Sequence, residues 1–287
     1  MSKTLRIMRL TLKEAMSRRM IPAGVALSLV YLVVFGLAFT FAQDKTTAAQ
    51  AVTGTRGRVL LGVGMATLPL AGLYIVNLLS GVLALFLSVG AVSAEVDSGT
   101  LHALLARPMR RSQFLLGRWL AYALMISVYV TVMAGLVLLM ASAIGGYVAP
   151  DPPRAIGLMI LAALFLLTLS LLGSTFLSTL TNGAVAFTLF GLGWLSGVIE
   201  VLGGSQNNDA MLTLGTSIAI LIPADQLWRA ASYYVESASL LVGQSVLGNA
   251  VPMLANAPPT PFLVVWGLIY PLLLLGSAVY VFAQRDL

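Results

Sequence analysis

The sequence predicts an all-α polytopic membrane protein with six transmembrane helices, and three observations support this fold class. Of the 287 residues, 59% are hydrophobic and only 9% are charged, whereas soluble domains carry about 25% charged residues. Five long runs contain no Asp, Glu, Lys or Arg: Met20–Gln43, Val59–Ala94, Trp119–Pro150, Ala155–Ile199 and Ser237–Gln284. A membrane span needs about 20 mostly apolar residues. The fourth run is therefore long enough for two spans, with a turn expected at Thr181–Gly183.

The first segment, residues 2–19, is predicted to be an amphipathic helix that precedes the first span. Its apolar side chains recur at spacings of three and four residues, on one helix face: Leu5, Met8, Leu12 and Met16. Its cations fall on a neighbouring sector: Lys3, Arg6, Arg9 and Lys13. Such a helix lies in the headgroup plane of a membrane, with its cations on anionic lipid. Alternatively, the segment is only a positive flank that fixes the orientation of the first span.

The six spans are predicted at residues 21–41, 66–92, 119–144, 156–177, 184–202 and 262–283. Asp44–Arg58 is expected to be a polar loop after the first span. Asn77 lies inside the second span, where a buried amide forms a helix–helix hydrogen bond more often than a transport site. In the fifth span, Gly191, Gly193 and Gly197 allow a close helix approach. That approach could occur within one protomer or across a dimer.

Residues 203–261 are predicted to form surface or re-entrant helices at the outer face of the membrane. They contain two weakly apolar pieces, residues 210–222 and 240–254. The first has 13 residues, too short to cross a membrane at about 1.5 Å per residue. Polar residues, glycine and proline dilute the second. Pro223 is expected to start a helix, with Asp225 near its positive end.

The distribution of basic residues predicts that both chain termini lie in the cytoplasm. In that orientation eleven basic residues fall in inner segments: Lys3, Arg6, Arg9, Lys13, Arg18, Arg19, Arg107, Arg110, Arg111, Arg118 and Arg285. Five fall in outer segments: Lys45, Arg56, Arg58, Arg154 and Arg229. Because inner loops carry the basic excess, we expect a multi-pass protein of the cell inner (cytoplasmic) membrane. The same bias accounts for the net charge of +6 and argues against nucleic-acid binding.

The loop of residues 95–117, between the second and third spans, is unusually rich in charge. We expect Asp97 or Ser98 to cap a short helix from Gly99 to Ala106, because a side-chain oxygen there satisfies free N–H groups of the first turn. Pro108 cannot continue that helix, so the chain must turn. A short charged helix on the water side of a membrane protein suits docking to a soluble partner. Alternatively, its arginines only anchor the topology.

This loop also carries a resemblance to a known family. Its pattern consists of Glu95, Gly99-Thr100-Leu101, Leu104-Leu105, Pro108, Arg111, and Gly117-Arg118 leading into a span. The pattern resembles the loop between the second and third spans of ABC-2 type permeases, the membrane subunits of ABC exporters with the type V fold. A weaker resemblance links residues 203–261, with their Pro-Ala-Asp…Arg element, to the permease of the nitrous-oxide-reductase maturation system.

The resemblance to ABC-2 permeases implies a partner and a set of contacts. In that family the loop carries a coupling helix that sits in a cleft of the ATPase subunit. It implies a homodimer with two ATPase subunits, and an interfacial elbow helix at residues 2–19. The implied coupling residues are Glu95, Gly99, Thr100, Leu101, Leu104, Leu105, Arg107, Pro108 and Arg111. A smaller contact is implied at Thr181 and Asn182.

The sequence contains no constellation of residues for an enzyme. No G-x-x-x-x-G-K-[ST] loop occurs, so ATP and Mg would be bound by the partner ATPase, and we expect no cofactor on this chain. There is no cysteine and a single histidine, which excludes an H-E-x-x-H zinc site. His102 lies beside no obvious nucleophile. The 12 methionines are scattered, which favours apolar packing over a Cu(I) site.

We therefore predict the permease subunit of an ATP-driven exporter. The alternative is an ATP-independent secondary transporter or channel, which predicts inverted repeats and acids at membrane depth. A candidate substrate path or gate comprises Asn77, Glu200 and Arg229. An ionisable group near a span is costly unless it is paired or faces water, so Glu200 either pairs with Arg229, lines an outer gate or lies among headgroups. The sequence does not specify the cargo.

Overall fold

The computed structural model describes residues 3–17, 20–50, 54–97, 110–236 and 258–284. Most of the described residues are helical, with no strand among them, which confirms the predicted all-α class. The helices are α1 (Lys3–Ser17), α2 (Met20–Gln50), α3 (Thr55–Ser88), α4 (Ser93–Asp97), α6 (Arg111–Gly145), α7 (Pro152–Ser174), α8 (Thr179–Ser205), α9 (Asp209–Leu221), α10 (Ala224–Tyr233) and α12 (Pro261–Gln284).

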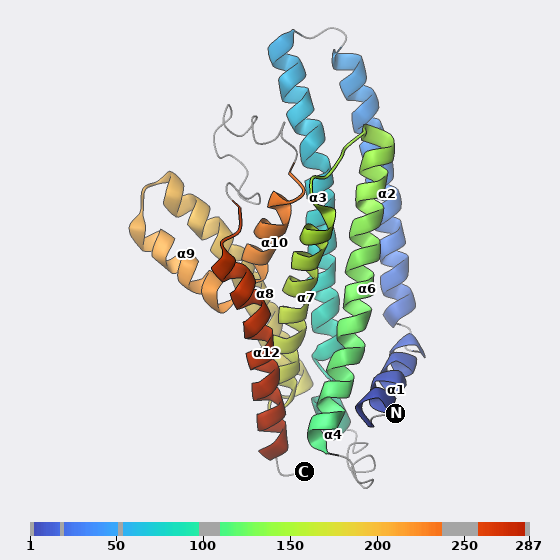
Figure 1. Ribbon diagram of the computed structural model, residues 1–287, viewed down its shortest axis with the longest axis vertical. Helices are drawn as coiled ribbons and strands as arrows, with labels where there is room; N and C mark the ends of the chain where they lie inside the picture. Colours follow the sequence, from blue (N-terminus) through green and yellow to red (C-terminus); the bar gives the residue numbers. More distant parts are fainter. Residues whose placement is uncertain (1–2, 18–19, 51–53, 98–109, 237–257, 285–287) are drawn as a thin grey trace.

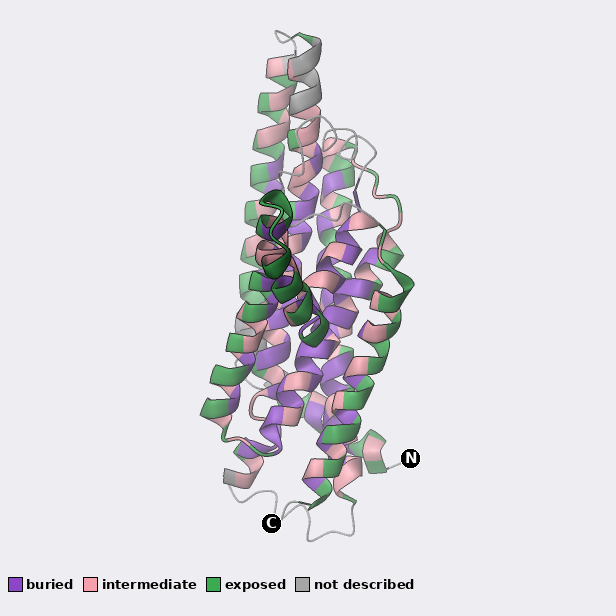
Figure 2. Ribbon diagram, turned by 90° about the vertical axis from the view of Figure 1, so that its left-hand side faces the viewer, coloured by how far each residue is buried: buried purple, intermediate pink, exposed green. Residues whose placement is uncertain are grey.

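Among these residues, six helical segments are long and apolar enough to cross a membrane, as the sequence predicted. They are Gly24–Ala49, Leu61–Val96, Arg111–Gly145, Pro152–Ser174, Thr179–Ser205 and Pro261–Gln284. α7 lies at the centre of the bundle and packs against α3, α6, α8, α10 and α12 (Figure 1). Buried residues line the interior and exposed residues follow the outer helix faces (Figure 2). α1, α4 and the last turn of α12 lie at the same end, which we name the α4 end.

The first two spans are longer helices than their apolar sequence indicates. α2 continues to Gln50 and α3 begins at Thr55. Most of Asp44–Arg58 is therefore helical, and the prediction of a polar loop over this range is wrong. The hydroxyls of Thr46 and Thr47 donate hydrogen bonds to the backbone carbonyls four residues earlier in α2, at 2.7 and 2.9 Å. The length of an apolar run predicts how much of a helix lies in hydrocarbon. It does not predict where the helix ends, because a polar stretch of the same helix can continue into water.

The turn between α7 and α8 also differs from the prediction. It lies at residues 175–178, and Ser178 caps α8 by accepting a hydrogen bond from the backbone N–H of Thr181. Thr181–Gly183 therefore forms part of the first turn of α8 rather than the loop. Thr-Asn-Gly resembles a turn in composition, but the capping serine three residues earlier satisfies the free N–H groups and starts the helix there.

Between α8 and α12, α9 and α10 form a pair of helices bent by 95°. α9 packs along α8, and its 13 residues agree with the short helix expected there. Two glycines of α8 make room for the corner of the pair. A Cβ added at Gly193 would lie 2.7 Å from Ile222 Cγ2, and one at Gly197 would overlap the Asp225 carboxylate. Both glycines thus serve packing within the protomer.

The α9–α10 corner reaches the middle of the bundle. Ala224 and Asp225, at the start of α10, line the same cavity as Asn77, Ala162 and Phe190. These three residues lie within α3, α7 and α8, well away from the ends of each helix. The corner of the pair is therefore inserted among α3, α7 and α8, and the membrane topology of α9 and α10 stays a prediction. The other short piece expected in this region, 240–254, lies outside the described residues.

The far end of α10 is tied to the loop between α6 and α7. The Tyr147 hydroxyl donates to the Val235 carbonyl, and the Asp151 N–H donates to the Tyr234 carbonyl at 2.9 Å. Burial raises the pKa of Tyr147, and the Glu236 carboxylate adds to the rise. The phenol therefore stays protonated and remains a donor at neutral pH. These bonds fix the C-terminal end of α10 to the loop between α6 and α7.

Candidate functional site

The first candidate region is the joint at the α4 end, built around Arg118 of α6. Its Nη2 lies 2.5 Å from Glu95 Oε1 and 3.9 Å from Glu14 Oε2, and its Nη1 donates to the Ala91 carbonyl. The Phe114 ring lies 4.8 Å from the guanidinium. Arg118 is buried, at 5% exposure, and a buried cation needs such partners. One side chain thus joins α1, the α3–α4 corner and α6. We name these contacts the Arg118 joint.

α1 packs on α6 through a face that the sequence did not predict. Its buried residues are Ile7, Thr11 and Ala15. A Cβ added at Gly117 of α6 would lie 2.7 Å from Ile7 Cβ, so this glycine lets the two helices approach closely. Leu5, on the predicted apolar face, is 37% exposed. Met8 and Leu12, on the same face, are half-buried, so the protein covers this face only in part.

Asn182, which was predicted to contact the ATPase, is buried and braces α8 against two neighbouring segments. It is 2% exposed, and its Nδ2 donates to the carbonyls of Val89 at 2.8 Å and Ser170 at 2.9 Å. The amide thus joins α8 to the α3 end and to α7, and the predicted contact of Asn182 with an ATPase stays a prediction. Thr181 is exposed and shares a hydrogen bond with Ser178, so only Thr181 of this pair is accessible to a partner.

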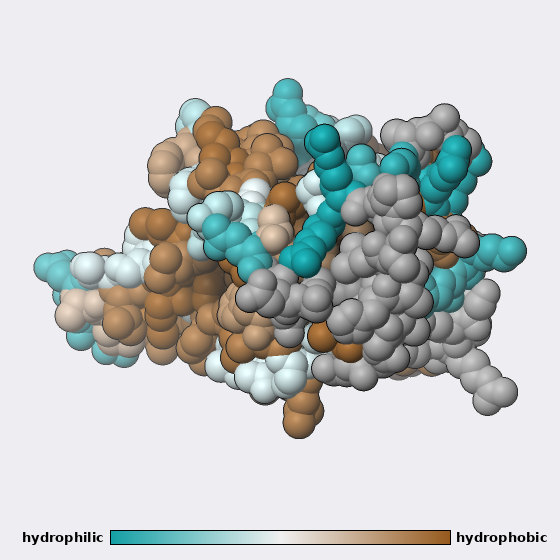
Figure 3. Space-filling model, turned by 90° about the horizontal axis from the view of Figure 1, so that it is seen from below, coloured by the Kyte–Doolittle hydropathy of each residue, from teal (hydrophilic) through white to brown (hydrophobic). Residues whose placement is uncertain are grey.

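Arg111, also predicted to contact the ATPase, reaches the last turn of α12. Its Nη1 donates to the carbonyls of Phe282 at 3.4 Å and Ala283 at 3.3 Å, a favourable use of a cation at a helix C-terminus. Figure 3 looks onto this end of the molecule, where hydrophilic side chains gather beside apolar surface. The remaining predicted coupling residues lie outside the described residues: Gly99, Thr100, Leu101, Leu104, Leu105, Arg107 and Pro108.

The second candidate region is an ion cluster between α8 and α10. Arg229 Nη2 lies 2.5 Å from Glu200 Oε2, and Arg229 Nε lies 3.1 Å from Asp225 Oδ2. Gln226 Nε2 donates to Glu200 Oε1 at 3.4 Å. Of the roles considered for Glu200, the structure shows the pairing with Arg229. Asp225 was not predicted to be a member of this cluster, although its position four residues before Arg229 on one helix was a usable signal.

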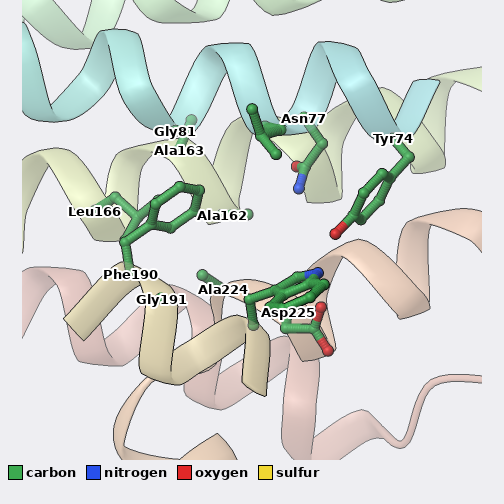
Figure 4. Close-up of a pocket in the computed structure, with 12 residues that line it drawn as sticks. Tyr74, Asn77, Gly81, Ala162, Ala163, Leu166, Phe190, Gly191, Ala224 and Asp225 are labelled. Carbon is green, nitrogen blue, oxygen red and sulfur yellow. The ribbon is translucent and has the colours of Figure 1, made fainter. Parts of the chain in front are cut away.

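The ion cluster borders a cavity of about 380 Å³ between α3, α7, α8 and α10. The lining residues are Tyr74, Asn77, Leu78, Gly81, Ala162, Ala163, Leu166, Phe190, Gly191, Trp194, Ala224 and Asp225. The Asn77 amide points into this cavity (Figure 4). Its side chain has no hydrogen-bond partner among the described residues. Asn77 therefore lines a cavity rather than bonding a neighbouring helix.

Comparison with known families agrees with this architecture. The family model for "ABC-2 family transporter protein" matches residues 8–287. The chain belongs to this family. It is thus a multi-pass membrane permease of an ABC system. No curated protein matches the sequence. The family match does not test the resemblance of residues 203–261 to the nitrous-oxide-reductase maturation permease, which stays a prediction.

Proposed function

We propose that this chain is the membrane-spanning subunit of an ATP-driven ABC-2 exporter that works with a separate ATPase subunit. The observation that carries the proposal is the Arg118 joint, which flanks residues 98–109. Glu95 lies just before that segment and Arg118 lies just after it, and the two are in contact. A force applied to the segment would therefore reach α3 and α6 together.

The same end also provides a route to α8. Asn182 bonds the Val89 carbonyl at the end of α3, and Ser93 shares a hydrogen bond of 2.8 Å with Thr179. Displacement of the α3–α4 corner would move the start of α8 as well. Because α3 and α8 form two walls of the cavity, docking and ATP-driven closure of the partner would change the width of the cavity.

Family membership and the distribution of charge support a proposal for the rest of the assembly. We infer a homodimer that carries two ATPase subunits, with ATP and Mg held by those subunits. The chain would lie in the inner membrane with both termini cytoplasmic, where the positive α4 end meets the ATPase. α1 would lie among anionic headgroups through its exposed face. Asn77, Glu200 and Arg229 would border the substrate route, because they lie at or beside the cavity.

The experiment is co-purification and stimulated ATP hydrolysis with the partner ATPase. We expect Leu104→Arg to lose both, because a cation would replace an apolar contact in the docking segment. Val148→Arg is the matched control, since Val148 is 80% exposed in the loop between α6 and α7. If Leu104→Arg keeps full co-purification and stimulation, the docking assignment is wrong. Transport by the chain without any ATPase would favour the secondary transporter.

A further inference from the structure

We propose that the cavity between α3, α7, α8 and α10 binds an amphiphilic cation, with the charged group beside Asp225 and the apolar body against the aromatic walls. This inference rests on the proposed function and names the chemical class of its substrate. It is carried by three features of the cavity: the balance of charge, the composition of the walls, and the side on which exposed residues lie.

The ion cluster has more negative than positive charge. Two carboxylates, Glu200 and Asp225, share the single guanidinium of Arg229. Arg229 is the only basic residue between Arg154 and Arg285 in the sequence, so residues 237–257 cannot add another. A carboxylate without a full counter-charge is costly in a low-dielectric site, and a bound cation would remove that cost.

The excess charge falls on the carboxylate that faces the cavity. Glu200 has the shorter contact with Arg229, at 2.5 Å, and also accepts from Gln226. Asp225 contacts Arg229 through Nε at 3.1 Å and is the member of the cluster that lines the cavity. A cation entering the cavity would therefore meet Asp225 and would be kept from Arg229 by the two acids.

The walls suit an apolar body that carries a diffuse positive charge. Tyr74, Phe190 and Trp194 contribute three aromatic rings, and cations are attracted to such ring faces. The Tyr74 hydroxyl and the Asn77 amide point inward from α3 (Figure 4) and can accept hydrogen bonds from an ammonium group. A volume of about 380 Å³ lies within the range of small-molecule sites, about 300–1,000 Å³.

The exposure of two lining residues indicates the side from which a ligand enters. Leu78 on α3 and Trp194 on α8 are 41% and 42% exposed, so the cavity meets the surface between these helices. Both residues lie about half-way along spans, at the depth of the hydrocarbon. An amphiphile can reach this opening from within the membrane, where neither a sugar nor a free inorganic ion dissolves. These observations favour an amphiphilic cation over a hydrophilic cargo.

The test compares two ions of the same shape and opposite charge, tetraphenylphosphonium and tetraphenylborate. The full chain, without ATPase, is placed in nanodiscs of zwitterionic lipid, and binding above that of empty nanodiscs is measured by equilibrium dialysis. We expect saturable binding of the phosphonium and none of the borate. Asp225→Asn should weaken phosphonium binding about tenfold, because a close charge pair is lost. Asp209→Asn, an exposed acid of α9, should leave binding unchanged.

A second pair of variants keeps the test decisive if Asp225→Asn folds poorly. A Cβ at Gly191 or at Gly135 meets no atom within 4 Å, yet only Gly191 lines the cavity. Gly191→Leu should therefore abolish phosphonium binding, and Gly135→Leu on α6 should preserve it. Equal binding of the borate, or unchanged phosphonium binding in Gly191→Leu, would overturn the inference. Co-purification with the ATPase is scored separately, so the proposed function can stand when this inference fails.

Discussion

The two ion clusters of this protein have the same composition and opposite surroundings. Each contains one arginine and two carboxylates, and in each the closest nitrogen–oxygen distance is 2.5 Å. In the Arg118 joint the second acid, Glu14, is 44% exposed and lies 3.9 Å away. In the cluster of Arg229 the second acid, Asp225, is 13% exposed and lines a cavity.

This difference separates a structural joint from a binding site. Water can solvate Glu14, so the extra negative charge of the joint costs little, and the Ala91 carbonyl and the Phe114 ring also stabilise Arg118. Asp225 is little exposed to solvent, and it shares the guanidinium of Arg229 with Glu200. An ionisable group at membrane depth that lacks a full counter-charge is a functional candidate, whereas the Arg118 joint has the partners expected of a mechanical connection.

The largest expected effect is the loss of the shared cation between α8 and α10. Arg229→Met would leave two carboxylates, at most 15% exposed, without a counter-charge. We expect a loss of about 3–5 kcal/mol in the free energy of unfolding, measured by chemical denaturation in detergent. The control is Arg154→Met, whose side chain is 68% exposed beside Asp151 and which should cost less than about 1 kcal/mol. If Arg229→Met and Arg154→Met lower the free energy of unfolding equally, burial does not make the Arg229 cluster more dependent on its cation than the exposed Arg154–Asp151 pair.

The next effect compares the two acids of the Arg118 joint. Glu95→Gln weakens the 2.5 Å contact and should cost about 1.5–3 kcal/mol, the range for hydrogen bonds to charged groups. Glu14→Gln should cost less than about 1 kcal/mol because Glu14 is half-exposed. ATPase stimulation per folded complex should fall with Glu95→Gln and persist with Glu14→Gln. A stable Glu95→Gln protein with full stimulation would show that force does not pass through this contact.

A smaller effect tests whether Asn182 is a brace or a partner contact. Asn182→Ala would leave the carbonyls of Val89 and Ser170 without their donor and should cost about 1–3 kcal/mol. The neighbouring Thr181→Ala, at an exposed position, should stay within about 0.5 kcal/mol. Thermal unfolding measures both. If Asn182→Ala instead keeps its stability and loses the ATPase, the original prediction of a surface contact was right.

The sequence predicted what depends on local pattern and missed what depends on three-dimensional packing. Hydrophobic runs identified six spans, and the cost of an unpaired acid near a span made pairing with Arg229 one of the three roles considered for Glu200. The role of Asp225 could not be read in the same way, because its contact with the cavity depends on how deeply α9 and α10 enter the bundle. Asn182 was taken for a turn residue because Thr-Asn-Gly is turn-like, whereas its two carbonyl partners lie on other segments.

The smallest effects come from two glycines on α8, and they should have opposite signs. A Cβ at Gly197 would overlap Asp225, whereas one at Gly191 meets no atom within 4 Å. Gly191→Ala should therefore stabilise the protein by up to about 1 kcal/mol through helix propensity. Gly197→Ala should destabilise it by about 1 kcal/mol, because overpacking of about 1–3 kcal/mol outweighs that gain. Thermal unfolding measures the signs. If Gly197→Ala is instead stabilising, α10 does not approach α8 closely enough to hold Asp225 at the cavity, and the contrast between the two clusters loses its basis.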